Sequence, residues 1–312
     1  MKKIEKISKR WQKISFSNKS YEHYPVLYRE VIDLLKPEKR KVVVDATLGM
    51  AGHSLMMLEL MPGDGLLIGM DRDSESLETA RSMLAQYKER IRLFHANHSD
   101  LEYVLSQCSV KKADAFLFDL GISMFQMYDS QRGFSFLKNG ALDMRMDRTA
   151  GISAYDLVNC LSEKELSDII SKYGEERQSQ RIARAIVDSR KVNPIATTAE
   201  LASIIESVAF SKGGRHPATR TFQALRIAVN SELDTAVPAV QKALELLEPG
   251  GAAAVITFHS LEDGMIKRLF KSASASGEFR LVNKKAVLPS YAEVKENSRS
   301  RSAKLRVIER IG

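Results

Sequence analysis

Apolar residues in this chain gather in short runs that are separated by stretches with helical periodicity. The first run, residues 42–44, is three consecutive valines, as in a strand that is buried on both faces. Strands and helices therefore alternate, which predicts an α/β fold with a doubly wound parallel sheet. Further strands are expected over residues 66–71, 91–95, 113–121 and 252–258, with two closing strands at 279–287 and 304–310.

The pattern changes between residues 122 and 226, where no run resembles a central strand. Ser162 and Glu165 have the spacing of a capping box, and Thr197 and Glu200 repeat it. We therefore expect a helical insert between strands of the sheet. Its helices are predicted over residues 153–158, 162–173, 176–189 and 198–208.

Three parts of the chain follow from these patterns. Residues 1–20 hold seven Lys or Arg and one acid, and we expect a basic N-terminal arm there. Residues 21–122 and 227–312 form the predicted sheet domain, and residues 123–226 form the predicted helical insert. The polar segment 290–302 is expected to be a loop.

The first predicted strand is followed by small residues, Gly49, Ala51 and Gly52. Small side chains let a ligand approach the backbone, and the next helix offers free N–H groups at its start. Asp71 ends the second strand, roughly 20 residues further on, where α/β nucleotide folds bind ribose hydroxyls. A nucleoside-containing cofactor is indicated. NAD and S-adenosylmethionine both remain open here, beside an ordinary βαβ unit without a ligand.

Composition narrows the function classes. The chain has 312 residues, of which 44% are hydrophobic and 28% charged, as in a soluble globular protein. No apolar run approaches the roughly 20 residues that span a membrane. Cys108 and Cys160 give neither a disulfide framework nor a metal-ligand spacing, so we expect no metal and a reducing cytoplasm. The net charge of +8 favours a polyanionic partner.

The second half of the predicted sheet resembles class I methyltransferases, which favours S-adenosylmethionine over NAD. Longer motifs are more specific. By these motifs the chain resembles the ribosomal RNA small subunit methyltransferase H family, the bacterial 16S rRNA (cytosine-N4)-methyltransferases. The matching stretches cover nearly the whole chain after Tyr21: residues 23–27, 45–54, 71–73, 119–121, 132–136, 142–147, 173–177, 181–186, 216–226, 258–263 and 301–306.

The resemblance implies a class I, Rossmann-like methyltransferase domain with an inserted helical domain for RNA recognition. It implies methylation of the N4 amine of a cytidine in the decoding region, with S-adenosyl-L-methionine as cofactor. Small-subunit rRNA or an assembling small ribosomal subunit is the expected partner, in the cytoplasm. No membrane association is expected, and a homodimer stays open.

The resemblance also implies the site residues. Ala51, Gly52 and His53 are expected to hold the methionine part of the cofactor. Asp71 is expected to bind the ribose and His98 to lie by the adenine, and Asp119 and Gln126 complete the pocket. We hypothesise further that Asp119 is catalytic and accepts a hydrogen bond from the cytosine N4 amine. The expected RNA-binding residues are Arg215, His216, Arg220 and Arg226.

Departures from the family pattern keep a second hypothesis open. The family usually has more glycine around Met50 and Ala51, and its loop at residues 124–128 usually contains a proline. A weakly active or inactive relative that binds RNA as a ribosome assembly factor is therefore the alternative, which weak cofactor affinity would reveal. An NAD-dependent oxidoreductase fits poorly with the closing strands. A DNA cytosine-N4 methyltransferase lacks support because no Asn/Asp-Pro-Pro-Tyr motif occurs.

Overall fold

The computed structural model describes residues 15–16, 19–20, 25–210, 214 and 216–312. Most of the predicted basic arm lies outside these residues. Within it, β1 (Ser15–Phe16) and β2 (Lys19–Ser20) pair in antiparallel fashion. Among the described residues, no helix is long and apolar enough to cross a membrane.

The chain divides into two compact units, one of residues 1–121 with 234–312 and one of residues 122–233. We had expected the insert to end at residue 226. That position falls inside α11 (Thr219–Asn230), whose apolar face packs against α8 (Glu163–Gly174) in the insert. The helix therefore belongs whole to the second unit, because its packing continues past residue 226.

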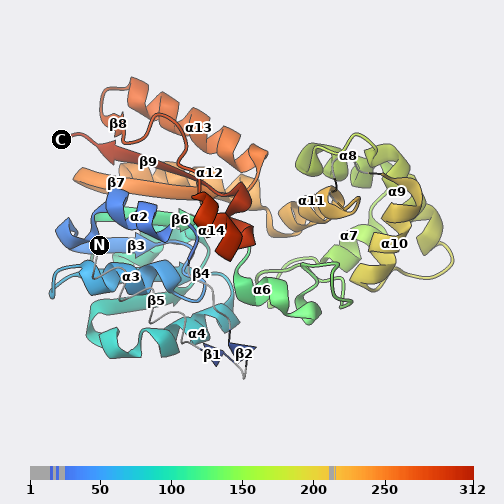
Figure 1. Ribbon diagram of the computed structural model, residues 1–312, viewed down its shortest axis with the longest axis horizontal. Coiled ribbons are helices and arrows are strands. Elements are labelled where there is room, and N and C mark those ends of the chain that lie inside the picture. Colours follow the sequence, from blue (N-terminus) through green and yellow to red (C-terminus); the bar gives the residue numbers. More distant parts are fainter. Residues whose placement is uncertain (1–14, 17–18, 21–24, 211–213, 215) are drawn as a thin grey trace. The chain divides into compact units, whose positions relative to one another are not determined.

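The first unit is built on a seven-stranded sheet with the order β5-β4-β3-β6-β7-β9-β8 (Figure 1). The first five of these strands are parallel to one another, and β9 runs antiparallel to both of its neighbours, β7 and β8. Strand order reverses between β3 and β6, and ligands of such sheets bind beyond the carboxyl ends of strands at this switch. The strands are β3 (Val42–Asp45), β4 (Leu66–Asp71), β5 (Ile91–His95), β6 (Ala113–Asp119), β7 (Leu247–Thr257), β8 (Phe279–Leu281) and β9 (Lys304–Arg310).

Helices cover both faces of the sheet, as the consecutive valines predict. Val43 joins the core on one face and Val44 the core on the other, because successive side chains of a strand point to opposite faces. The first core includes α2 (Tyr28–Leu35), α3 (Gly52–Leu60) and α4 (Ser74–Met83), and the second includes α5 (Leu101–Gln107), α12 (Glu232–Glu245) and α13 (Ser260–Ala275). The predicted α/β fold is confirmed.

The second unit is helical and has its own apolar core. The two predicted capping boxes are present, at Ser162 with Glu165 and at Thr197 with Glu200. Its remaining helices are α6 (Met124–Tyr128), α7 (Ala154–Cys160), α9 (Ser179–Arg190) and α10 (Thr198–Val208).

The connection between the last two strands differs from our expectation. The strand predicted over 279–287 ends at Leu281, and the predicted loop 290–302 contains α14 (Tyr291–Glu296) and a 3₁₀ helix, Ser298–Ser302. Ser290 caps α14 by accepting from the N–H of Glu293. The Glu293 carboxylate in turn accepts a 2.7 Å hydrogen bond from the backbone N–H of Leu27. This contact joins residues that lie far apart in sequence, so local pattern did not reveal it.

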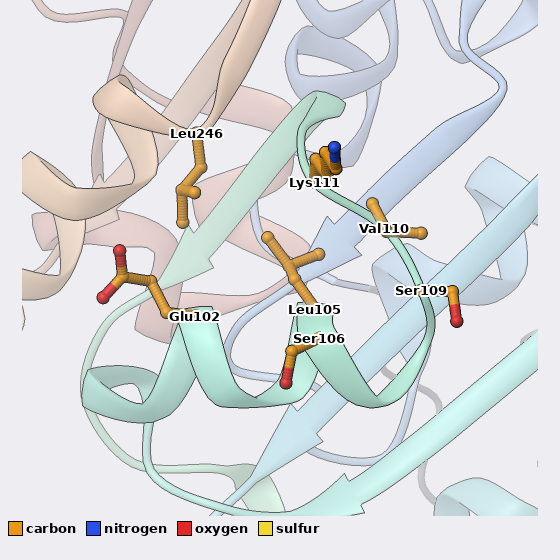
Figure 2. Close-up of a pocket in the computed structure, with 7 residues that line it drawn as sticks. All are labelled: Glu102, Leu105, Ser106, Ser109, Val110, Lys111 and Leu246. Carbon is orange, nitrogen blue, oxygen red and sulfur yellow. The ribbon is translucent and has the colours of Figure 1, made fainter.

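A hollow of about 520 Å³ lies at the start of β6, where the strand follows α5 (Figure 2). It is lined mainly by α5 and by the segment Ser109 to Lys111, with Leu246 on the other side. This is the amino-terminal edge of the parallel strands. It lies at the opposite end of β6 from the strand tips described next.

Candidate functional site

Three neighbouring parallel strands end in an aspartate. Asp45, Asp71 and Asp119 are the last residues of β3, β4 and β6. Because β4, β3 and β6 are adjacent in the sheet, the three carboxyl groups lie along one edge. Such a concentration of acid is costly unless each group is bonded, protonated or matched by a cation.

Asp45 is a site residue that our sequence reasoning missed. Its carboxylate accepts from the hydroxyl of Ser54 at 2.6 Å and from the N–H of Thr47 at 3.2 Å. Burial raises the pKa of Asp45 to about 6. These bonds tie the tip of β3 to α3 and so shape the turn between them. The signal was present in the sequence, since Asp45 directly follows the valine run.

The turn after β3 leaves the start of α3 open. Gly49 and Ala51 both have left-handed backbones, with φ of 52° and 62°. Ala51 is the residue that precedes the helix, and no side chain caps it. Gly52 packs so tightly that a Cβ there would lie 2.4 Å from Cγ of Pro25. The first N–H groups of α3 therefore remain available to an anionic ligand.

Asp71 is fixed by backbone donors on both oxygens. Oδ2 accepts from the N–H of Gly49 at 2.7 Å, and Oδ1 accepts from the N–H of Asp73 at 2.8 Å. Burial raises the pKa of Asp71 to about 6. Each carboxylate oxygen has a second lone pair, so the oriented group retains capacity for ligand hydroxyls.

His53 is a neutral ring beside Asp119. Its Nε2 lies 2.9 Å from the carbonyl oxygen of Val26, which can only accept, so Nε2 carries the proton. Burial lowers the pKa of His53 to about 4. Its Nδ1 lies 3.7 Å from Oδ2 of Asp119. With a neutral ring, this contact leaves the aspartate without a countercharge.

Asp119 carries the largest perturbation among the three acids. Burial, together with the nearby carboxylates of Asp45 and Glu262, raises the pKa of Asp119 to about 8. Its Oδ1 is buried and has no hydrogen-bond partner within the described part of the chain. Its backbone N–H donates to the Thr47 hydroxyl at 2.6 Å, which fixes the strand tip. The site thus offers a buried acceptor that lacks a donor or a cation.

Glu262 is a second residue that we did not single out. It forms a capping box at the start of α13 with His259, whose Nδ1 accepts from the N–H of Glu262 at 3.4 Å. The carboxylate of Glu262 accepts from the N–H of Phe258 at 3.0 Å. The three-residue spacing from His259 to Glu262 is the sequence signal of such a cap.

His98 occupies a fixed position in the same unit. It is buried, its Nε2 lies 3.2 Å from the Thr235 hydroxyl, and its ring meets Phe118 edge to face at 6.4 Å. Burial, aided by the charge of Arg72, lowers the pKa of His98 to about 4. The ring is therefore neutral, and it lies three residues past the end of β5.

Gln126 belongs to the second unit and has a local function. Its Oε1 accepts from the N–H of Ser123 at 2.9 Å, and the Ser123 hydroxyl accepts from the N–H of Gln126 at 3.3 Å. The pair is a capping box at the start of α6. The only oxygen of the Gln126 side chain, which we expected at the cofactor pocket, is therefore used in the helix cap.

Arg226 is engaged inside the second unit. Its guanidinium donates to both carboxylate oxygens of Glu232, each at 2.8 Å, and both side chains are largely buried. A bidentate buried pair of this kind holds its arginine strongly. Arg215 lies outside the described residues.

The two other expected RNA-binding residues are more exposed. Arg220 donates to the carbonyl oxygen of Glu175 at 2.8 Å. His216 stacks on Phe136 with ring centroids 4.3 Å apart, and its Nε2 lies 2.7 Å from the Glu206 carboxylate. An RNA role for these residues stays a prediction.

Comparison with known proteins gives a uniform answer. The model of the MraW methylase family matches residues 20–311. Ribosomal RNA small subunit methyltransferase H of Persephonella marina is 45% identical over 293 residues, covering 93% of this chain and 99% of that protein. The proteins of the same name from Caldicellulosiruptor bescii and Geobacter sp. are 43% and 45% identical, again over 93% of this chain and 100% and 99% of theirs.

These matches confirm three expectations from the sequence: the family, a methyltransferase activity and S-adenosylmethionine as cofactor. The sheet confirms the Rossmann-like class I arrangement. The match runs through both units and includes every strand tip described above, so it is not confined to a shared nucleotide fold. The chain belongs to the MraW methylase family.

Proposed function

We propose that this methyltransferase acts on 16S rRNA of the small ribosomal subunit, at the N4 amine of a cytidine in the decoding region. The observation that carries the chemistry is the acidic edge of the sheet, where Asp119 offers a buried oxygen without a partner. The relatives, each named a ribosomal RNA small subunit methyltransferase H, support the substrate. The specific amine follows from the sequence resemblance.

The residues at the strand tips fit S-adenosylmethionine. The uncapped start of α3, at Ala51, Gly52 and His53, suits the carboxylate of its methionine part. Asp71 is oriented by two backbone donors and suits the ribose hydroxyls. The orphan oxygen of Asp119 suits a cation, and the cofactor is a sulfonium.

One further residue of the sheet unit suits the proposed pocket less directly. His98 is neutral and lies beyond the tip of β5, and its ring suits stacking beside an adenine. Gln126 lies in the helical unit, and its Oε1 already accepts a hydrogen bond from the N–H of Ser123, so its expected contact with the cofactor stays a prediction from the sequence.

The cofactor supplies an electrophilic methyl group when it is bound, so the chain's task is to align the amine and stabilise charge. The N4 amine of cytosine is a weak nucleophile because its lone pair is delocalised into the ring. A hydrogen bond accepted from this amine strengthens it. We assign that acceptor to Asp119, which must be ionised for the task, and a nearby cation would lower its pKa from about 8.

The proposal extends to partners and location. An assembling small ribosomal subunit presents the decoding region to a basic protein with a net charge of +8. A target cytosine must be splayed from its neighbours to reach a strand-tip site. The cytoplasm is the corresponding location, and a homodimer stays open.

The decisive test is methyl transfer from labelled S-adenosylmethionine to small subunits that lack the modification, followed by nucleoside analysis. We expect N4-methylcytidine with the wild-type protein and none with Asp71→Ala. Asp64→Ala is the matched control, because Asp64 is an exposed aspartate in a turn. A different methylated nucleoside would overturn the proposed position, and transfer only to other RNAs would overturn the substrate.

The assembly-factor alternative rests on the departures near the cofactor. Ala51 has a left-handed backbone where glycine is less strained, and Gln126 is committed to a helix cap. Titration calorimetry separates the two hypotheses. A dissociation constant for S-adenosylmethionine in the micromolar range favours the enzyme, and absence of binding favours the assembly factor.

A further inference from the structure

The connection between β8 and β9, residues 282–303, lies at the same edge of the sheet as the strand-tip acids. Thr257, at the carboxyl end of β7, pairs with Lys304 at the start of β9. An isolated bridge joins Val287 to Leu305. Figure 1 shows α14, in red, at the end of the sheet where the parallel strands finish. The connection is therefore placed where a bound substrate would approach the sheet.

Hydrogen bonds tie this connection to the proposed cofactor site. The Glu293 carboxylate accepts from the N–H of Leu27 at 2.7 Å. The neighbouring carbonyl oxygen, that of Val26, lies 2.9 Å from Nε2 of His53, and Nδ1 of His53 lies 3.7 Å from Asp119. Glu293 is itself buried. One side of α14 is thus fixed beside the site, which leaves the other side facing outward.

The outward side combines bare aromatic and aliphatic surface with positive charge. Tyr291 is 86% exposed and Leu288 is 61% exposed, so both offer apolar surface to a partner. The segment contains five Lys or Arg residues and two acids. Four of its cations are exposed and take part in no ion pair within the described ranges: Lys284, Lys285, Lys295 and Arg301.

We propose that residues 282–303 form a second RNA-contacting surface, on the sheet domain itself and separate from the helical insert. Tyr291 stacks on an unpaired base of the substrate, and the lysines neutralise its backbone phosphates. Base stacking on an aromatic side chain with flanking cations is the usual recognition mode for single-stranded RNA. This inference rests on the proposed function, because it takes the rRNA as the occupant.

Position and charge favour RNA over other occupants. An exposed tyrosine among lysines also suits an anionic membrane surface. A membrane bound there, however, would occupy the edge of the sheet through which the substrate must reach Asp119. RNA binding at this surface instead holds the strand next to the target cytosine against the domain that methylates it.

The test compares substitutions in this surface with matched substitutions at the opposite edge. Tyr291→Ala is paired with Tyr103→Ala, since Tyr103 is 63% exposed on α5. The double variant Lys284→Gln/Lys285→Gln is paired with Lys111→Gln/Lys112→Gln, of which Lys111 lines the hollow of Figure 2. Affinity for unmodified small-subunit rRNA is measured at several salt concentrations, and S-adenosylmethionine affinity is measured by calorimetry.

We expect Tyr291→Ala to weaken RNA binding by about 5- to 100-fold, the effect of losing one stacked base. In the double lysine variant, the plot of log binding constant against log salt should be less steep by about 1.4, because two phosphate contacts are lost. Affinity for S-adenosylmethionine should stay at the wild-type value in both variants, because the substituted side chains are outside the strand tips. The control variants should bind RNA as the wild type does.

The outcomes separate this inference from the proposed function. If the wild type binds the rRNA and both surface variants match their controls, the surface inference is wrong and the proposed function stands. If the wild type binds neither small-subunit rRNA nor small subunits that lack the modification, both are wrong. If the surface variants lose binding to vesicles of phosphatidylglycerol but keep RNA binding, the surface belongs to a membrane and our inference fails.

Discussion

Burial and two neighbouring acids set the protonation state of Asp119, while the nearest ring adds no positive charge. His53 lies nearest, but its proton is held on Nε2 by the Val26 carbonyl oxygen and burial keeps the ring neutral. Asp45 and Glu262 add negative charge. The folded protein therefore favours a protonated Asp119, which makes both its stability and its cofactor affinity dependent on pH.

The first prediction concerns stability and pH. The pKa of Asp119 is about 8 in the folded chain, against 3.8 as its ordinary value. Between these pH values the unfolded chain releases the proton and the folded chain keeps it, so stability falls as pH rises. An asparagine at this position does not ionise, so Asp119→Asn should not lose stability in this way as pH rises. The melting temperature of the variant relative to wild type should rise from about pH 4 to about pH 8 and then level off.

Asp64→Asn serves as the control in the same thermal scans, because Asp64 is 71% exposed. A melting-temperature difference between Asp119→Asn and wild type that stays constant over this pH range would contradict the assignment of a raised pKa.

The second prediction concerns cofactor charge. S-adenosylmethionine is a sulfonium cation, whereas S-adenosylhomocysteine is a neutral thioether, so an ionised Asp119 distinguishes them. Asp119→Asn should weaken binding of the cation by about tenfold, the value of one charge-assisted contact, and leave the thioether within about twofold. Calorimetry with both ligands at pH 7 and 9 checks this. Equal losses for the two ligands would show that Asp119 contributes shape and not charge.

At the scale of elements, tight packing has opposite effects at two places. It leaves the start of α3 open to a ligand, and it buries an ion pair between α11 and Glu232. The turn before α3 needs left-handed backbones and a glycine against Pro25, so it holds the helix start close to the tip of β3. In the insert, Arg226 on α11 is used for a buried ion pair. The turn before α3 leaves N–H groups open to a ligand. The ion pair with Glu232 instead keeps the Arg226 guanidinium away from any ligand.

Gly52→Ala should destabilise the first unit by about 1–3 kcal/mol, because the new methyl group overlaps Pro25 and forces the turn to shift. Gly63→Ala is the matched control, since no atom lies within 4 Å of a Cβ placed there. Urea unfolding measures both. If the two variants were equally stable, the contact with Pro25 would not constrain the turn.

Arg226→Met should destabilise the insert by about 3–5 kcal/mol, because it leaves the Glu232 carboxylate buried without its partner. Adding Glu232→Leu should recover much of this loss, since two apolar groups replace the pair. Denaturant unfolding of the single and double variants gives the energies. A single variant that keeps wild-type stability and loses only RNA affinity would instead support the phosphate-binding role expected from the sequence.

At the scale of the whole molecule, the sequence is divided between a sheet unit that holds the strand-tip acids and a helical unit with its own core. The sheet unit is made from two separate stretches of chain, because the helical unit lies between β6 and β7 in the sequence. Ligand binding at the strand tips should stabilise this unit in particular, because the tips belong to it.

Cofactor binding should raise the free energy of unfolding by about 2.7 kcal/mol at a concentration of 100 times its dissociation constant. Asp71→Ala should abolish most of the resulting shift in melting temperature, and Asp64→Ala should retain it. A shift of equal size in Asp71→Ala would place the ribose elsewhere.

Much of this protein is readable from the sequence because its signals are local. The valine run, the alternation of strands and helices and the capping boxes at Ser162 and Thr197 each depend on neighbouring residues, and each is present in the structure. The strand-end acids Asp71 and Asp119 are local signals too. The roles of the individual site residues remain proposals, since charge and distance show what they can bind and not what they do bind.

Tertiary structure decided the features that depend on distant partners. Asp45 and Glu262 act on Asp119 only because the sheet brings their strands and helix together. The helix α14 forms where the sequence predicts a loop, and Glu293 on it bonds to Leu27 across the fold. Arg226 looks like an exposed cation in the sequence and is a buried ion-pair partner in the fold. Pattern determines which segments form strands and helices, whereas burial and long-range contact determine which charges remain available for function.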